Sequence, residues 1–286
     1  MKQIYLSDNG PKVSQAIYGF WRWTNNDLST PNKFEKTVEL CLNLGINTFD
    51  FADLFCNFNA EEEFGKLLQT NIIAREKVVL FSNGGQNNKG KTAHPDSSRN
   101  FLFEGVDNTL KKLNTDYLDV FLLNKFDYLT DIEELASTLF ALVDSKKVKH
   151  IGLANFSQSE HELISSVYKL PIVTSHVELN LLKTDAIKDG RINFLKQHYS
   201  KPLAWAPLAG GRITNGTDPE AVKLREKLAE IQEKYNTNIE AIAVAWLHKL
   251  GALPLLGTLD ENRLSNAVKA FEIELSNEDW YLLFNI

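Results

Sequence analysis

Eight short apolar runs recur along the chain, and residues with the apolar spacing of a helix follow each run. In these intervening segments apolar residues return every three or four positions, as at Ile132, Leu135, Leu139 and Leu142. Alternating strands and helices form a parallel sheet, and eight units favour a closed (β/α)8 TIM barrel over an open doubly wound sheet. The runs are AIYGFW, NTFDFA, VVLFSN, DVFLLN, HIGLAN, VTSHVELN, LAWAPLA and ALPLLGT.

Two short alternating segments precede the first run and flank the dipeptide Asn9-Gly10, which is a strong hairpin signal. They predict an N-terminal β-hairpin that plugs the barrel. Further along, Ser157 with Glu160 three residues later has the pattern of a capping box and predicts a helix start. Length alone allows one or two domains. Because no linker or low-complexity segment interrupts the series, we expect a single domain over residues 1–286.

Charge, cysteine content and hydropathy limit the partners. The 31 basic and 37 acidic residues give a net charge of −6, with no basic stripe, so nucleic acid is not expected as a partner. Cys41 and Cys56 lack a Cys-x-x-Cys spacing, so we expect neither a disulfide framework nor a metal site. The N-terminus lacks the apolar core of a signal peptide, and no apolar run reaches membrane-spanning length. We expect a cytoplasmic protein without membrane association.

The segment Gly85–Thr92 has the spacing of a phosphate-binding loop, G-x-x-x-x-G-K-T. That chemistry requires a helix that begins at the Lys-Thr pair, so that its first amides hold the phosphates. Pro95 disfavours a helix there, and the following strand ends in Asn124 rather than in an acid for magnesium. We therefore predict a flexible polar loop, followed by a helix that starts near Ser97 or Ser98.

The residues at the ends of the apolar runs are the candidate site, since active sites of (β/α)8 barrels lie at the C-terminal ends of the strands. Most of them are polar. Each one alone has a structural alternative, because Asn and Asp at strand ends also form turns and cap helices. The set comprises Gly19, Asp50, Asn83, Asn124, Asn155, His176, Trp205, Gly257 and Thr258.

Five segments, in order along almost the whole chain, resemble the aldo-keto reductases, a family of NADP(H)-dependent (β/α)8 barrel enzymes. The hairpin plug is also a trait of that family. The resemblance implies reduction of a small carbonyl compound by hydride from the nicotinamide. The segments are GINTFDFADLF, LNTDYLDVFLLN, KVKHIGLANFS, LAWAPLAGG and PLLGTLDENRLSNA.

In this family a tyrosine gives the proton to the carbonyl oxygen, with help from a lysine, an aspartate and a histidine. By resemblance, Asp50 matches the aspartate, but Phe55 stands at the tyrosine position. Asn83 stands at the lysine position and Asn124 at the histidine position. Phenylalanine has no proton to give, and a free phenol titrates near pH 10 and needs such help. Three of the four catalytic positions are therefore substituted.

The two asparagines each bring an amide that can donate a hydrogen bond to Asp50. We expect a neutral network of Asn83, Asp50 and Asn124 that keeps the shape of the site without moving a proton. The alternative is drift in a pocket that the protein no longer needs.

The resemblance also implies how NADP(H) would bind. Asn155 matches a residue that holds the nicotinamide amide, and Trp205 matches the aromatic residue on which the nicotinamide ring stacks. Ala154 replaces an expected serine, and His176 an expected glutamine. The positions that receive the adenosine phosphate and adenine are matched by Gly257, Thr258, Arg263 and Asn266. Arg263 would supply a charged contact to phosphate, although a simple surface charge is the alternative.

Two functional hypotheses remain. The first is a pseudoenzyme without ordinary carbonyl reductase activity, retained for NADP(H) binding or for a protein partner that the sequence does not identify. The second is a functional NADP(H)-dependent oxidoreductase with altered chemistry, in which Asn124 polarises a carbonyl group and water supplies the proton.

Overall fold

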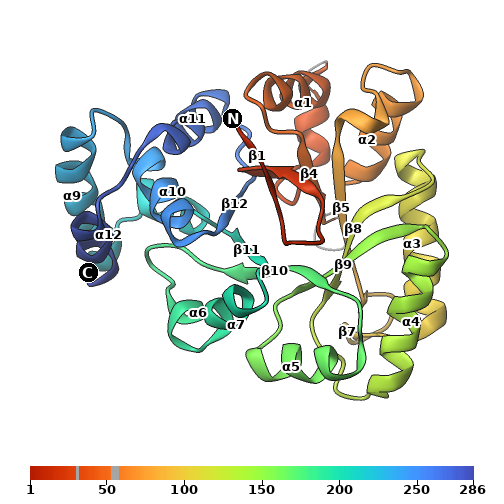
Figure 1. Cartoon of the computed structure of the whole chain (residues 1–286). Helices are drawn as coiled ribbons and strands as arrows, with labels where there is room; N and C mark the ends of the chain where they lie inside the picture. The colour runs from red at the N-terminus through yellow and green to blue at the C-terminus, as the bar shows by residue number, and fades with distance from the viewer. Residues whose placement is uncertain (30–31, 53–57) are drawn as a thin grey trace.

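The computed structural model describes residues 1–29, 32–52 and 58–286, and it forms a closed barrel of parallel strands (Figure 1). The predicted (β/α)8 barrel is confirmed, and each apolar run of the sequence overlaps one barrel strand. The barrel closes where β12 pairs with β3, in the register Leu255 with Ile17. Its strands are β3 (Ile17–Gly19), β4 (Thr48–Phe51), β5 (Val79–Gly84), β8 (Leu118–Asn124), β9 (Val148–Ala154), β10 (Ile172–Glu178), β11 (Lys201–Trp205) and β12 (Leu253–Leu256).

Helices lie outside the strands, as Figure 1 shows. Some of them start with a side-chain cap: Ser157 forms the predicted capping box with Glu160, and Asp131 accepts two backbone amides at the start of α4. The helices are α1 (Lys33–Asn43), α2 (Ala60–Gln69), α3 (Arg99–Leu113), α4 (Ile132–Asp144), α5 (Gln158–Val167), α6 (Asp185–Lys188), α7 (Arg191–Gln197), α8 (Arg212–Asn215), α9 (Pro219–Lys234), α10 (Ile239–Leu250), α11 (Glu261–Val268) and α12 (Asn277–Phe284).

The predicted N-terminal hairpin is confirmed as β1 (Gln3–Tyr5) paired with β2 (Lys12–Ser14). Its turn is centred on Asp8-Asn9 rather than on Asn9-Gly10, because Gly10 N donates to Ser7 O at 3.1 Å and Leu6 N to Pro11 O at 3.0 Å. Leu6 also accepts a hydrogen bond from Lys201 N, at the start of β11, at 2.9 Å. Leu6 is fully buried and packs in the interior cluster of the barrel. The hairpin therefore closes the N-terminal end of the barrel.

The segment with phosphate-loop spacing forms a second small hairpin. Strand β6 (Gln86–Asn87) pairs with β7 (His94–Pro95), and α3 begins only at Arg99, after Ser98 in the capping position. The prediction of a late helix start is confirmed, and the polar loop before the helix contains a short hairpin that was not predicted. The Lys-Thr pair lies between the two short strands and does not begin a helix, so the phosphate-binding geometry is absent from this segment.

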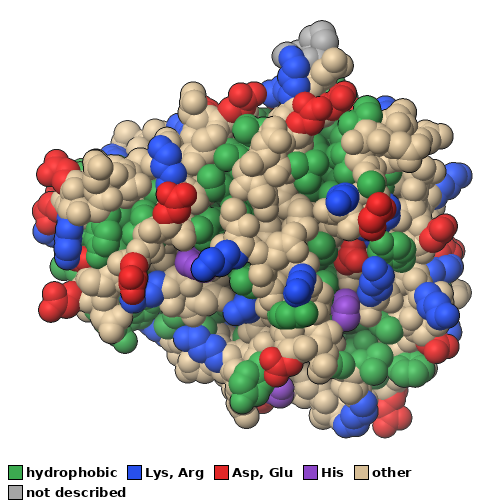
Figure 2. Space-filling view, turned by 45° about the horizontal axis from the view of Figure 1, so that its top comes forward, with side chains coloured by type: hydrophobic (Ala, Val, Ile, Leu, Met, Phe, Trp, Pro, Cys, Tyr) green, Lys and Arg blue, Asp and Glu red, His purple; other side chains and the backbone are tan. Residues whose placement is uncertain are grey.

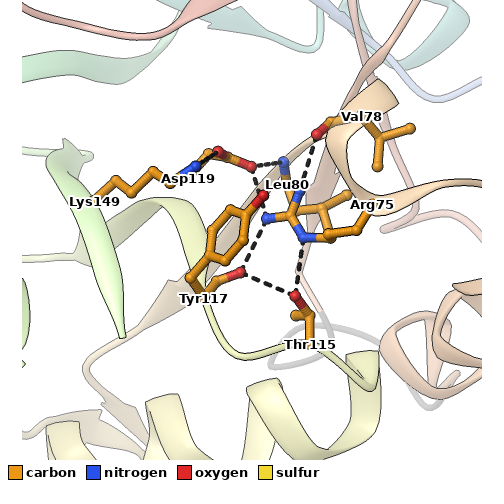
Figure 3. Close-up of polar contacts among 7 residues, drawn as sticks. All are labelled: Arg75, Val78, Leu80, Thr115, Tyr117, Asp119 and Lys149. Atoms are coloured by element: carbon orange, nitrogen blue, oxygen red, sulfur yellow. Dashed lines mark hydrogen bonds and ion pairs between the residues drawn. The ribbon is translucent and has the colours of Figure 1, made fainter. Parts of the chain in front are cut away.

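A polar cluster fixes the N-terminal ends of three barrel strands (Figure 3). Arg75, in the 3-10 helix η3 (Arg75–Lys77), donates to Thr115 Oγ1 at 2.9 Å and to Asp119 Oδ2 at 2.8 Å. Its guanidinium also donates to the carbonyl oxygens of Val78 and Tyr117, each at 2.9 Å. Asp119 further accepts from Leu80 N at 3.0 Å and from Lys149 Nζ at 3.2 Å, so the cluster links β5, β8 and β9.

The visible surface carries both signs of charge, and Figure 2 shows Lys and Arg side chains interspersed with Asp and Glu side chains. In the described part of the chain, no helix is long and apolar enough to cross a lipid bilayer. Within the same residues, no three His, Cys, Asp or Glu side chains are grouped to hold a metal ion.

Candidate active site

The polar strand ends meet at the C-terminal rim of the barrel, because parallel strands all end on the same side. Asp50 is the residue around which they gather, and it is only 2% exposed. Asn83 Nδ2 donates to Asp50 Oδ1 at 3.1 Å and to Phe51 O, also at 3.1 Å. Burial raises the pKa of the Asp50 carboxyl well above its usual range, and the Asn83 hydrogen bond partly opposes this shift.

His176 is the other ionisable group beside Asp50. Its Nε2 lies 3.9 Å from Asp50 Oδ1, which is too long for a hydrogen bond, and this nitrogen has no hydrogen-bond partner among the described residues. Burial lowers the pKa of His176 to about 3. Both shifts favour uncharged side chains, so the pair resembles a carboxylic acid beside a neutral imidazole more than an ion pair. No Lys or Arg in the described chain forms an ion pair with Asp50.

Asn124 does not join Asp50, so the expected network of two asparagines around Asp50 is wrong in that half. Its Oδ1 accepts a hydrogen bond from Asn155 Nδ2 at 2.9 Å, and its Nδ2 has no partner among the described residues. The topology explains the difference. Strand β5, which carries Asn83, is paired with the strand of Asp50, whereas Asn124 is one strand further and pairs in register with Ala154.

A chain of hydrogen bonds runs from Asn124 to Trp205 along the rim. Besides its bond to Asn124, Asn155 accepts from Trp205 Nε1 at 3.0 Å through Oδ1. Asn155 has a left-handed backbone with φ of 62°, which asparagine tolerates better than most residues. Its own N–H donates to His176 O at 3.0 Å, so the backbone is held as well as the side chain.

Phe55, at the position of the proton donor, lies outside the described residues, as does Cys56. The consequence of Phe55 for proton transfer therefore rests on its chemistry. A phenyl ring carries no exchangeable proton.

The positions matched to the nucleotide tail follow β12 and begin α11. Thr258 O accepts from Tyr18 OH at 3.0 Å, and Thr258 Oγ1 accepts from Asp260 N at 3.2 Å. Asp260 caps α11 by accepting the amides of Asn262 and Arg263 at 2.9 and 3.0 Å. These amides are already bonded to a carboxylate, so an anion at this position would have to be held by side-chain cations rather than by the helix N-terminus.

Arg263 and Asn266 have different surroundings. The guanidinium of Arg263 reaches the side-chain oxygen of Asn215 at 3.0 Å, in the amide orientation that satisfies both groups. Asn266 Oδ1 accepts from Lys269 Nζ at 3.4 Å, so that amide interacts within its own end of α11. Of the two, Arg263 is the residue that lines a cavity.

That cavity has a volume of about 80 Å³ and lies between the end of β12, α11 and the loop after β11. Arg22 lines it together with Arg263, so it carries two cationic side chains. Its size suits a small anionic group rather than a whole dinucleotide, since pockets for drug-sized ligands span roughly 300 to 1,000 Å³. Sequence reasoning missed Arg22, which directly follows the first barrel run.

The loop that lines this cavity has an unusual backbone. Ala206 and Ala209 have φ of 51° and 50°, and Gly210 and Gly211 have φ of 69° and 98°. Left-handed conformations cost a non-glycine residue roughly 1 kcal/mol or more, and they cluster at ligand-binding sites. The sequence signal for this feature was the Gly-Gly pair after LAWAPLA. The backbone strain agrees with a binding role for the cavity.

Comparisons with known proteins agree with this architecture. The profile of the aldo/keto reductase family matches residues 16–284. A 6-dehydroglucose reductase of Agrobacterium fabrum is 29% identical, and the match covers 100% of this chain and 98% of the relative. The oxidoreductase YdhF of Escherichia coli is also 29% identical, over 98% and 96% of the two chains. The crystal structure of the thermostable aldo-keto reductase Tm1743 superposes with a TM-score of 0.83 at 24% identity, over 100% and 99% of the chains.

Proposed function

The chain belongs to the aldo/keto reductase family of oxidoreductases, and from that premise we propose that it binds NADP(H) but lacks ordinary carbonyl reductase activity. One observation carries the proposal. The buried carboxyl group of Asp50 faces the neutral amide of Asn83 at 3.1 Å, where catalysis in the family would need a cation. Without that cation no tyrosine could be activated, and the tyrosine position itself is Phe55.

Carbonyl reduction needs a hydride at carbon and a proton at oxygen, and the proposal concerns the proton. A bound nicotinamide would supply the hydride. Loss of the general acid lowers the rate by about 10²- to 10⁴-fold, which is roughly 2.7 to 5.5 kcal/mol at 1.36 kcal/mol per decade. The losses at Phe55, Asn83 and Asn124 belong to one coupled set, so their effects do not simply multiply.

The adenosine and phosphate end of the nucleotide (its tail) fits this chain better than the nicotinamide end (its head). At the tail, Arg22 and Arg263 line one cavity and can pair with phosphate oxygens. At the head, Ala154 has no hydroxyl group to donate, and Asn155 is bonded to its neighbours. Since only NADP(H) carries the 2′-phosphate, Arg263 favours it over NAD(H). The affinity should fall with added salt, because charge-assisted contacts at the surface are screened.

The alternative function is an oxidoreductase with altered chemistry that acts on a small carbonyl compound. It is favoured by the unpartnered Nδ2 of Asn124, which could donate a hydrogen bond to a carbonyl oxygen while water supplies the proton. The relatives named as a reductase and as an oxidoreductase support the same alternative.

Two measurements test the proposal. Steady-state consumption of NADPH with a panel of small aldehydes and quinones should be far slower than that of an ordinary family member assayed in parallel. Turnover within tenfold of that enzyme would favour the alternative. Titration calorimetry with NADPH should give a heat of binding, and NADPH should raise the Tm of the protein in a thermal unfolding assay. If neither NADPH nor NADH gives heat or thermal stabilisation at millimolar concentration, nucleotide binding is excluded. A role in binding a protein partner would then replace the proposed nucleotide binding.

A further inference from the structure

We propose that the hydrogen-bonded chain of Asn124, Asn155 and Trp205 closes the nicotinamide end of the site. The protein then binds a dinucleotide through its adenosine and phosphate groups alone, and holds the corresponding ADP-ribose compound as tightly as the intact dinucleotide. This inference rests on the proposed nucleotide binding, and it names the part of the nucleotide that is recognised.

The first step concerns the side chain of Asn155, the residue matched to the nicotinamide amide. Both of its polar atoms are engaged, since Nδ2 donates to Asn124 at 2.9 Å and Oδ1 accepts from Trp205 at 3.0 Å. To turn toward a nicotinamide, Asn155 would have to leave Asn124, which is 1% exposed and already has one unpaired amide nitrogen among the described residues. A buried polar group left without a partner costs more than one new hydrogen bond returns.

The second step concerns the backbone, which prevents Asn155 from moving away as a unit. Its N–H donates to His176 O at 3.0 Å, and the preceding carbonyl, of Ala154, accepts from Lys125 N at 2.9 Å. The asparagine therefore stands between the ends of β8 and β10, fixed on both sides. Trp205 is tied to it through the indole edge, so the ring position depends on the same chain.

The third step concerns the remaining head-group positions. Ala154 offers only a methyl group where the family would place a hydroxyl. His176 is 5% exposed, and its Nε2 lies beside Asp50 inside the barrel. None of the described residues matched to the nicotinamide is therefore a free donor at the surface of the rim.

The tail end is independent of this chain of amides. Arg22 follows β3, Arg263 lies on α11, and the glycines that complete the cavity follow β11. No hydrogen bond in the described structure links these residues to Asn124 or Asn155. The attraction between the two arginines and a phosphate does not depend on the hydrogen bonds of Asn124 and Asn155. The affinity for the phosphate can therefore be measured separately from contact with the nicotinamide.

The test compares two probes by calorimetry on the full chain, NADP⁺ and 2′-phospho-ADP-ribose. We expect dissociation constants within about threefold of each other. In saturation-transfer NMR with NADP⁺, the adenine protons should receive saturation and the nicotinamide protons should not. NADP⁺ binding more than tenfold tighter than 2′-phospho-ADP-ribose would overturn this inference while supporting the proposed function. Absence of heat with both probes would overturn both.

Variants test the cause. Asn124→Ala removes the partner that holds Asn155, and we expect the preference for NADP⁺ over 2′-phospho-ADP-ribose to rise at least fivefold, with saturation appearing on the nicotinamide protons. Asn47→Ala is the matched control, since this half-buried amide precedes β4 at the opposite end of the barrel and accepts from Thr48 Oγ1 at 3.1 Å, away from Asn155. In this control variant the ratio of the dissociation constants for NADP⁺ and 2′-phospho-ADP-ribose should be the same as in the unaltered chain.

If Asn124→Ala does not fold, Trp205→Phe serves the same purpose, because it keeps an aromatic ring but removes the indole donor. An unchanged ratio in a folded variant of either kind would contradict the proposal that these hydrogen bonds close the head site.

Discussion

Asp50 is a carboxyl group in the interior of a barrel, and no Lys or Arg of the described residues pairs with it. Burial disfavours its charged form, so its pKa is raised in the folded protein. A group with a raised pKa stabilises the fold below its unfolded pKa, and this contribution is lost as pH rises through the folded pKa. Each unit of such a shift corresponds to about 1.36 kcal/mol. Asp50 therefore lowers the free energy of unfolding at neutral pH.

We predict that Asp50→Asn stabilises the protein at pH 8, by roughly 1 kcal/mol or more, and that its advantage shrinks toward pH 4. The Asn variant keeps the acceptor for Asn83 and removes the buried ionisable group. Urea unfolding at both pH values measures the difference. A variant less stable than the wild type at pH 8 would show that the carboxylate is ionised and favourably bound in the fold.

A second prediction at the same scale concerns the proton donor. Phe55→Tyr, Asn83→Lys and Asn124→His together should rebuild the family's catalytic set around Asp50, and Asn124→His also releases Asn155. Phe55→Tyr alone should recover little, because an unassisted phenol is a poor acid at neutral pH. We expect the triple variant to exceed the sum of the single variants by at least about tenfold in NADPH-dependent aldehyde reduction. A triple variant that binds NADPH and stays inert would show that the pocket itself is remodelled.

Residue contacts were only partly predictable from the sequence. The contact of Asn83 with Asp50 follows from neighbouring strand ends, and it was foreseen. The bond of Asn124 to Asn155 was not, because it depends on which of two neighbouring strand ends the side chain turns toward. The approach of His176 to Asp50 crosses the barrel interior, and strand order alone does not give that distance.

At the scale of elements, periodicity found all eight barrel strands, and the Ser157 capping box marked the start of α5. What it missed are short elements whose existence depends on partners elsewhere in the fold. Strands β6 and β7 have two residues each, too few to show an alternating pattern. The first hairpin turn is shifted from Asn9-Gly10 to Asp8-Asn9, since Ser7 O accepts from Gly10 N.

The cluster around Arg75 supports a prediction about how strands are held together. Arg75→Lys keeps the charge but loses the planar fork that reaches Thr115, two carbonyl groups and Asp119. We expect a loss of about 1 to 3 kcal/mol in the free energy of unfolding, because buried acceptors lose their partners. Arg212→Lys is the control, as its ion pairs are on the surface, and it should change little. Equal effects in urea unfolding would contradict a special role for the cluster.

For the whole molecule, the N-terminal plug joins the start of the chain to the barrel interior. We predict that Leu6→Ala lowers the free energy of unfolding by about 2 to 5 kcal/mol, as large-to-small changes in cores do. Leu6 is fully buried, whereas the adjacent Tyr5 is 56% exposed, so Tyr5→Ala is the matched control. NADPH affinity should be unchanged, because the plug lies at the opposite end from the rim. A loss below about 1 kcal/mol would mean that the plug is not part of the cooperative fold.

Closure of the barrel between β3 and β12 has a consequence for synthesis. The register joins Ile17 to Leu255, so the first barrel strand cannot find its last neighbour until nearly the whole chain has left the ribosome. Until then β3 has an open edge, and open edges pair readily with other chains. Contacts so distant in sequence also form slowly. The sheet therefore stays open at β3 until its last strand, β12, has been made.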